Sequence, residues 1–400
     1  DPAQQSLIRG GDRLALSATV TNFAEAEVAY AWSCTSGNLE LGSSTLLSSA
    51  DGPNLVIAPD VLQQGTAYSI RVSVTSIADS ALTGTSVLSF STNAAPVLGE
   101  CASSPETGDA LTTTFRLECS GWVDPESDLP LLYRFQADVQ ADGTYIDLSG
   151  NQVLEFFDTI LPYPSSSSSS SSSTSTLTLR ALISDGVGAQ TSYSYSVVIS
   201  EVDVDVASTS TEVDALLGKG DTATSGTLLS GMVGAINKGS AAADAEASER
   251  AKAVDNIVAF VGKVSATGDV NDVRTPATLL QQSTQASSSA GLSQESATKS
   301  LDTLTQIINI TGFGATDSTA SAVGTLQNII LASSSNSSGS GNASSSSNTT
   351  SARVVSIAAN LGSALLADAL EDENAKDVRS GNLTVTSRRL SSKSLGGGAA

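Results

Sequence analysis

The sequence contains no histidine at all. The Ser-His-Asp triad, the Cys-His pair, the HExxH zinc site and the facial-triad iron site all require an imidazole, so none of them can form here. Three cysteines are also too few for a four-thiolate metal cage. Hydrolysis by a pair of carboxylates is the enzymatic chemistry that this composition leaves open.

Basic residues are scarce as well. Only 19 Lys and Arg stand against 41 Asp and Glu, which gives a formal net charge of −22. Phosphate backbones are bound by clustered lysines and arginines, so we predict no nucleic-acid partner, and an anionic membrane surface is disfavoured for the same reason. Aromatic residues make up only 4% of the chain, but the hydrophobic fraction of 40% is enough to form real cores.

Long apolar runs are missing too, and none approaches the roughly 20 residues that span a bilayer. The chain starts at Asp1, without a methionine or an apolar leader. We therefore expect an interior piece of a longer protein or a mature ectodomain. Its contact with a membrane would come through parts of the parent chain outside this sequence.

Residues 1–200 show the period-2 alternation of half-buried β-strands. Turn signals rich in glycine and aspartate separate the alternating runs. Short strands at this spacing predict two consecutive antiparallel β-sandwiches, with a boundary near residues 92–96. The predicted strands lie at 14–20, 28–32, 55–57, 68–74, 87–90, 112–119, 131–135, 177–183 and 193–199.

After residue 200 the apolar residues recur at helical spacing. Ser293 can cap one of the resulting helices, with Leu292 as a hydrophobic staple. We predict a mostly helical subdomain of about five helices, and then a strand at 382–386 that starts another unit. The helical periodicity covers 228–236, 251–264, 297–308, 323–330 and 354–366.

Two tracts of small polar residues interrupt these elements. Residues 165–173 are nine consecutive serines, and residues 333–351 are almost entirely Ser, Asn, Gly and Thr. Neither tract can bury enough apolar surface to offset the entropy of ordering it, so we expect both to be solvated, mobile loops.

The cysteines bear on the compartment. Cys101 and Cys119 flank a segment in which Gly108 can mark a turn. If both strands belong to one sheet, the two cysteines lie close enough for a disulfide, which implies an oxidising compartment. Two separate buried thiols are the alternative. Cys34 has no evident partner, and is either a buried free thiol or half of a bond made outside this sequence.

Sequons are a second indication of compartment. The N-x-[ST] pattern of N-glycosylation occurs at Asn309, Asn336, Asn342, Asn348 and Asn382. Ser- and Asn-rich sequence produces this pattern by chance, so the three sequons in the low-complexity tract count for little. Together with a disulfide, the sequons favour a secreted or cell-surface location.

One acidic turn could suggest metal binding. Asp124, Glu126 and Asp128 alternate, as a hard cation would accept, but Leu129 and Phe135 stand where an EF-hand loop has glycine and glutamate. A solvated acidic turn is therefore the better interpretation. We predict no catalytic, cofactor-binding or metal-binding residue in this chain.

The two tryptophans, Trp32 and Trp122, follow or lie on strand-like alternations. A lone tryptophan in a sandwich most often fills the core beside a disulfide, so we expect core positions for both. An exposed role in stacking on a ligand is the alternative.

One block of the second β region reads Asn93-Ala-Ala-Pro-Val-Leu-Gly-Glu-Cys101. It continues with Pro105, Gly108, Ala110-Leu-Thr-Thr113, Phe115, Cys119, Gly121-Trp122, Asp124, Pro130-Leu131 and Tyr133. This block resembles the receptor-for-egg-jelly (REJ) module of the polycystin family and of sperm receptors for egg jelly. The earlier runs Tyr30-Ala-Trp-Ser-Cys34 and Leu62-Gln-Gln-Gly-Thr-Ala-Tyr68 also resemble its first sandwich.

The pattern and the resemblance together predict β-sandwiches of the PKD or fibronectin-III type at 1–92 and 93–205, a helical subdomain at 206–380 and the start of a β unit at 381–400. In that family the corresponding region precedes an autoproteolysis site and membrane helices. The resemblance therefore implies a noncatalytic extracellular region, at the cell membrane, of a polycystin-like receptor or cation-channel component. Its role would be ligand sensing, force sensing or adhesion, with an extracellular protein or glycan as ligand.

Two other function classes stay open on the sequence alone. A secreted or wall-anchored adhesin built of similar sandwiches would use the serine tracts as O-glycosylated spacers. A carboxylate-based glycosidase would use carboxylates near Asp124, but the pattern suggests no large cleft-forming fold.

Overall fold

The fold is given by a computed structural model of the chain. It describes all residues except 1–7, 22–26, 165–172, 239–242, 265–272, 286–291, 311–317, 337–343, 368, 372 and 391–400. Within the described residues the chain forms fourteen strands, then seven helices and finally two more strands. The predicted β plus α class is confirmed.

The first β unit contains two sheets that share one core. In the larger sheet β6, β5 and β3 pair antiparallel, and β1 joins the other edge of β6 in parallel, while β2 and β4 form a separate antiparallel pair. Leu55 and Ile57 of the smaller sheet pack with Tyr68 and Phe90 of the larger one. The strands are β1 (Ile8–Arg9), β2 (Leu14–Ser17), β3 (Val28–Ser36), β4 (Asn54–Ile57), β5 (Ala67–Ser76) and β6 (Thr83–Asn93).

The second β unit is a β-sandwich. A five-stranded sheet in the order β11-β10-β13-β14-β8 packs against a three-stranded sheet in the order β12-β9-β7. Phe115 and Leu117 of one sheet and Phe135 and Leu179 of the other are completely buried between them, as the alternating pattern predicts. The strands are β7 (Glu100–Ser104), β8 (Thr107–Asp109), β9 (Thr114–Ser120), β10 (Leu132–Asp138), β11 (Tyr145–Asp147), β12 (Phe156–Ile160), β13 (Thr174–Ser184) and β14 (Gln190–Ser200).

Seven helices form the third unit around a single apolar core. Asp205 caps the first helix by accepting a hydrogen bond from the Ala207 N–H, which lowers the pKa of its carboxyl. Gly220 ends that helix in the left-handed conformation (φ 81°) that glycine adopts without strain. The helices are α1 (Val206–Lys219), α2 (Thr222–Lys238), α3 (Ala243–Val264), α4 (Arg274–Thr284), α5 (Gln294–Ile308), α6 (Ser318–Asn336) and α7 (Ser344–Leu365).

The predicted count of about five helices is too low, because none of the five periodic stretches covers α1 or α4. Helix α4 is buried on nearly every side, and polar residues such as Thr275 and Thr278 lie on its covered surface, so no apolar stripe marks it in the sequence. Helix α1 buries only Val206, Val213 and Leu217 over its whole length.

The Ser/Asn-rich tract 333–351 is only partly the loop that we expected. Helix α6 continues to Asn336 and α7 begins at Ser344, so most of the tract is helical and only 337–343 lie outside the described residues. Thr350 is buried, and its Oγ1 accepts a hydrogen bond from Gln294 Nε2 (3.0 Å). Extending an existing helix into such a sequence costs little free energy, because the unfavourable nucleation step has already taken place. The serines 165–172 lie outside the described residues.

The strand predicted at 382–386 exists but does not begin a separate unit. Strand β16 (Leu383–Ser387) pairs with β15 (Lys376–Ser380) in an antiparallel hairpin, and the boundary that we placed at residue 381 falls inside it. Val385 is buried in the core of the helices. The partner strand Lys-Asp-Val-Arg-Ser has a single apolar residue, which explains why the sequence did not reveal it.

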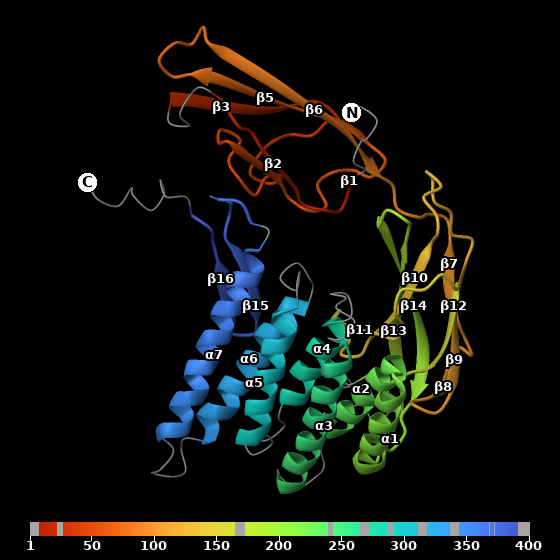
Figure 1. Cartoon of the computed structure of the whole chain (residues 1–400). Coiled ribbons are helices and arrows are strands. Elements are labelled where there is room, and N and C mark those ends of the chain that lie inside the picture. The colour runs from red at the N-terminus through yellow and green to blue at the C-terminus, as the bar shows by residue number, and fades with distance from the viewer. Residues whose placement is uncertain are drawn as a thin grey trace.

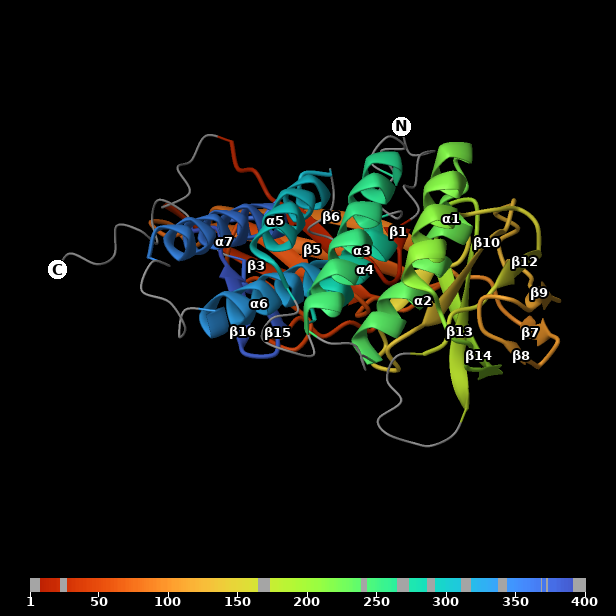
Figure 2. The same cartoon turned by 90° about the horizontal axis from the view of Figure 1, so that it is seen from below.

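Each of the three units contacts the other two, and Figure 1 shows how they are arranged. The first β unit lies across one end of both the helical unit with its hairpin and the second β unit. Seen from below, the helices lie in front of the strands of the first β unit, and α1 and α2 lie nearest the second (Figure 2). Leu111 and Ile160 of the sandwich pack against the helical core, and the Asp147 N–H donates to Thr275 Oγ1 (2.8 Å).

Candidate functional site

The block that resembles the REJ module builds the junction between the two β units. Buried Asn93 donates from Nδ2 to Oδ2 of Asp185 (2.6 Å), a buried carboxylate whose other oxygen accepts the N–H groups of a turn at 187–189. Thr191 Oγ1 donates to the Pro96 carbonyl (2.6 Å), and Val97 bridges to Val123. The linker is therefore held by hydrogen bonds along its length, which makes it a fixed junction between the units.

Cys101 and Cys119 are joined by a disulfide. They stand directly opposite each other on β7 and β9, neighbouring strands of one sheet, as the proposal of a shared sheet requires. Both are buried at the edge of the sandwich core. Cys34 is a half-buried free thiol within this chain, and its Sγ donates to the Ser36 carbonyl (2.9 Å).

The two tryptophans take different positions. Trp122 packs on the disulfide-containing core and meets Tyr193 edge to face, with 6.0 Å between ring centroids. A Cβ on Gly99 would lie 2.3 Å from its ring, so the glycine of the block is required by this close approach. Trp32 packs against the core of the first β unit, and its Nε1 donates to the Gly52 carbonyl (2.9 Å). Both tryptophans are half-buried, so each covers the edge of a core and neither is completely enclosed in one.

Trp32 lines a groove of about 430 Å³ on the first β unit. The groove lies between residues 16–21 and the larger sheet, where the two strands β2 and β4 leave part of that sheet uncovered. Ile70, Val72 and Leu88 contribute apolar surface, Thr19 and Ser86 contribute hydroxyls, and none of the described residues that line the groove is charged.

The carboxylates of the acidic turn at 124–128 accept hydrogen bonds from backbone N–H groups of this chain. Asp124 Oδ1 accepts the Asp128 N–H (2.7 Å), and Glu126 Oε1 accepts the Ala94 N–H at the junction (3.3 Å). The carboxylates thus hold a turn and the linker. In the part of the chain that the structure describes, no group of three or more Cys, Asp and Glu residues is placed to hold a metal ion.

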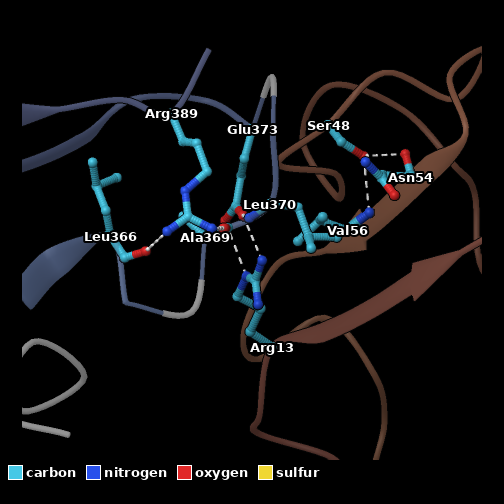
Figure 3. Close-up of polar contacts among 9 residues, drawn as sticks. All are labelled: Arg13, Ser48, Asn54, Val56, Leu366, Ala369, Leu370, Glu373 and Arg389. Atoms are coloured by element: carbon cyan, nitrogen blue, oxygen red, sulfur yellow. Dashed lines mark hydrogen bonds and ion pairs between the residues drawn. The ribbon is translucent and has the colours of Figure 1, made fainter. Parts of the chain in front are cut away.

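The first β unit also contacts the end of the chain, 360 residues away (Figure 3). Arg13 donates from Nε to Oε1 of Glu373 (2.9 Å) and from Nη2 to Oε2, a two-pronged ion pair. Glu373 is only 1% exposed, and Arg13 is 19% exposed. We call this ion pair, together with the hydrogen bond from the Asn374 N–H to the Leu47 carbonyl, the terminal clamp.

Polar contacts on both sides keep the terminal clamp in place (Figure 3). Glu373 Oε2 also accepts the Leu370 N–H (2.9 Å), and Arg389 donates to the carbonyls of Ala369 and Leu366 (2.8 and 3.1 Å). On the β side, the Asn374 N–H donates to the Leu47 carbonyl (2.7 Å). The clamp thus ties the strand β2 region to the segment that follows α7.

No motif in the sequence indicates the terminal clamp. Arg13 follows Asp12, and Glu373 is the last of three consecutive acidic residues at 371–373, so nothing local distinguishes either residue from its charged neighbours. Only the packing of the first β unit over the hairpin brings them together.

The sequons differ in how they are placed. Asn309 is the exposed C-cap residue of α5, and Asn382 is exposed in the turn of the β15–β16 hairpin. The side chains of Asn336, Asn342 and Asn348 lie outside the described residues. Among the helices that are described, none is long and apolar enough to cross a membrane.

Fold and site together define a disulfide-bonded β-sandwich protein with a tightly attached helical unit. Residues 3–231 match the REJ domain, which is more than half of the 400 residues. The chain therefore belongs to the REJ domain family, and the resemblance seen in the sequence is confirmed.

No curated protein matches the chain. Among solved structures, the amphioxus IgVJ-C2 molecule is similar over 47% of this chain and 97% of its own, with 10% identity and a TM-score of 0.19. Domains A168–A170 of titin are similar over 50% of this chain and 63% of their own, with 9% identity and a TM-score of 0.24. The family assignment rests on the REJ domain match alone.

Proposed function

We propose that this chain is a noncatalytic extracellular region of a polycystin-like membrane receptor or cation-channel component, on the extracellular side of the cell membrane. In this proposal it is a stack of REJ-type sandwiches and helices that transmits ligand binding or force. Its ligand is an extracellular protein or glycan. Membership of the REJ domain family supports the type of parent protein, and the disulfide supports an oxidising compartment.

The terminal clamp is the observation that carries the mechanical part of the proposal. Force applied between the two ends of the described chain enters at β1 and leaves after β16, and Arg13 and Glu373 lie close to these two points in the sequence. The clamp connects them without passing through the second sandwich or the helices. It would therefore bear load first, and its release would lengthen the molecule before any core unfolds.

Replacing Glu373 by glutamine is expected to release this contact. The change removes the charge from a buried group that accepts from Arg13 and Leu370, at a cost of about 1.5–3 kcal/mol to docking. Hydrogen exchange of the Asn374 N–H should then speed up by about tenfold or more. Hydrogen-exchange mass spectrometry of the segment 369–374 measures this.

The matched control is Glu371→Gln, which removes an exposed carboxylate from the same segment. Stretching single molecules by their ends then tests the function itself: Glu373→Gln should lower the force of the first release, and Glu371→Gln should not. Equal release forces in the two variants would rule out the clamp as the load-bearing contact.

The sequence of the complete parent gene tests the receptor proposal. Membrane helices encoded downstream would support a receptor or channel component, whereas repeats and an anchor signal would favour a wall-anchored adhesin.

Glycosylation at Asn309 and Asn382 is the second part of this proposal that can be tested. Both side chains are exposed at element ends, where a glycan can be attached without disturbing a core. Chain secreted from eukaryotic cells should lose mass on treatment with an N-glycosidase, and each Asn→Gln change should remove one glycan. An unshifted mass in all variants would argue against passage through the secretory pathway.

A further inference from the structure

Strand β6 has an open edge over most of its length. Among the described strands, β1 is the neighbour on this side, and it pairs with Thr92 and Asn93 alone. The first seven residues of β6, 83–89, are all exposed with the whole chain present. On their other side these residues pair with β5 without a break in register. The stretch is therefore an edge strand with one partner where a sheet can supply two.

A row of backbone groups points out from this edge. The Ser76 N–H donates to the Leu82 carbonyl (3.0 Å) at one end of the β5–β6 ladder. The Thr92 N–H donates to the Thr66 carbonyl (2.9 Å) at the other end. Because hydrogen-bonded pairs recur at every second residue of an antiparallel ladder, the even-numbered residues of β6 bond to β5. The odd-numbered residues within 83–89 therefore direct their N–H and C=O groups to the edge, where no strand of the described chain pairs with them.

The strand lacks the features that usually protect an edge from pairing, which are a lysine or another charge, a proline or a bulge. The run from Leu82 to Asn93 contains no charged residue and no proline. Val87 is 51% exposed and Leu88 is 45% exposed. In a chain with a net charge of −22, an uncharged and partly apolar edge is a place where two copies can meet without bringing like charges into contact.

The groove lined by Trp32 reaches the same edge. Trp32 pairs with Val72, and Val72 pairs with Ser86, so these three side chains form one row on the core face of the larger sheet. Gly84 and Ser86 are the small residues of β6 in the groove, and Leu88 is the large one. A Cβ added to Gly84 would meet no atom within 4 Å beyond its chain neighbours. The groove thus has room for a side chain from a strand added beside β6.

We propose that β6 pairs antiparallel with β6 of a second copy of this chain, about a two-fold axis at Ser86. Ser86 is the centre of the exposed stretch 83–89, so this register pairs every residue of the stretch with one of the other copy. Val87 of one copy then lies opposite Thr85 of the other, and Leu88 lies opposite Gly84. Each leucine enters the open part of the groove above the facing glycine, and the larger sheet continues through both copies.

The charges beside the edge are compatible with a second copy. Arg71 pairs with Val87 and is the one charged residue of β5. In the proposed register the row of Arg71 and Val87 continues into Thr85 and Ser73 of the other copy, so the two arginines do not face each other. Figure 1 shows β5 and β6 on the side of the first β unit that is turned away from the helices, where a second copy can approach. Because a seven-residue strand pair is a small interface, we expect a reversible dimer.

Analytical ultracentrifugation of the whole chain at physiological ionic strength tests for this dimer. A concentration-dependent equilibrium between monomer and dimer is expected. A chain that stays monomeric up to about 0.5 mM would overturn the proposal. Hydrogen exchange of the segment 83–89 would then identify the reason: slow exchange in a monomer means that the edge is covered within the chain, and fast exchange means that it is left for another partner. Either result contradicts pairing with a second copy.

Substitutions then locate the interface. Val87→Lys places a charge on the edge and should weaken dimerisation about tenfold or more. Val355→Lys is the matched control, because it makes the same change at a 69% exposed position on α7, and it should leave dimerisation unchanged. Val87→Pro removes an N–H that points away from β5, so it should weaken the dimer while far-UV circular dichroism stays that of the parent. Equal dissociation constants for Val87→Lys and Val355→Lys would place the interface elsewhere and overturn the proposal.

Cysteine cross-linking tests the register. In a Cys34→Ser background, Ser86→Cys should form a disulfide between two copies under mild oxidation, because the two-fold axis brings this residue opposite itself. Thr83→Cys and Ser89→Cys chains should not cross-link alone, since each position lies about 20 Å from its own counterpart. Mixing these two chains should produce the cross-link, because the register places Thr83 opposite Ser89. A dimer that does not cross-link through Ser86→Cys would contradict pairing about this axis.

Discussion

Replacing Glu246 by alanine is expected to lower the stability of the helical unit by about 3–5 kcal/mol, because it leaves a charged guanidinium buried without its counterion. Arg250 is 1% exposed and Glu246 is 3% exposed. Arg250 donates from Nε and Nη2 to Glu246 Oε1 (3.0 and 2.9 Å). From Nη1 it also donates to Asn237 Oδ1 (2.8 Å) and to the Ser283 carbonyl (3.1 Å).

These bonds make Arg250 the polar centre of three helices, since Asn237 lies on α2, Glu246 on α3 and Ser283 on α4. Burial lowers the pKa of the Arg250 guanidinium, and the hydrogen bond and charge of Glu246 oppose that shift. Without Glu246, the buried guanidinium has no counterion and keeps only the Nη1 hydrogen bonds to Asn237 and Ser283. Denaturant unfolding followed by far-UV circular dichroism measures the loss.

The control is Glu249→Ala on the same helix, which removes a half-buried carboxylate and should cost far less. A double change of Glu246 and Arg250 to leucine and methionine should recover much of the loss, since an apolar pair of similar volume needs no counterion. A Glu246→Ala variant within about 1 kcal/mol of the parent would show that the pair is not a buried ion pair in solution.

Replacing Cys101 and Cys119 by serine is expected to lower the stability of the second β unit by about 3 kcal/mol. The bond closes a loop with a sequence separation of 18, and its loss returns that much freedom to the unfolded chain. Both serine hydroxyls would also lie at buried positions. The measurement is thermal or denaturant unfolding with and without reductant.

Cys34→Ser provides the background for this experiment. It removes the free thiol and should change stability little, because Cys34 is only half-buried and unbonded to another cysteine. In that background, reductant reports on the single remaining bond. Peptide mapping without reduction should recover Cys101 and Cys119 linked, and free thiols at both positions would contradict the structure and weaken the extracellular proposal with it.

The sequence predicts a strand or a helix correctly where only one face of that element is buried. Strands such as β5 and β13 alternate because one face meets a core, and α5 shows its cap at Ser293 and its apolar stripe. The REJ block could also be identified from sequence, since Gly99, Cys101, Cys119 and Trp122 occur at fixed spacing and make contacts within one sandwich. In these cases the periodicity of apolar residues and the spacing of the motif residues are enough to predict the structure.

The elements that the sequence did not reveal are those whose surroundings come from distant parts of the chain. Helix α4 shows no apolar stripe because helices from several directions bury its polar as well as its apolar residues. Strand β15 shows no apolar face because a single valine suffices for a hairpin that packs on α6. Likewise, part of the Ser/Asn-rich tract is helical because α7 packs against α5, not because serine favours helices.

The sequence by itself excluded histidine-dependent sites within these residues, and it determined the β plus α order of the elements and the membership of the REJ domain family. Composition, period and motif spacing are local properties, so they can be read without coordinates. Only the tertiary structure brought Arg13 to Glu373, and Asn93 to Asp185. Contacts between charged or polar residues far apart in the chain leave no periodic trace, because each depends on how separately folded units pack together.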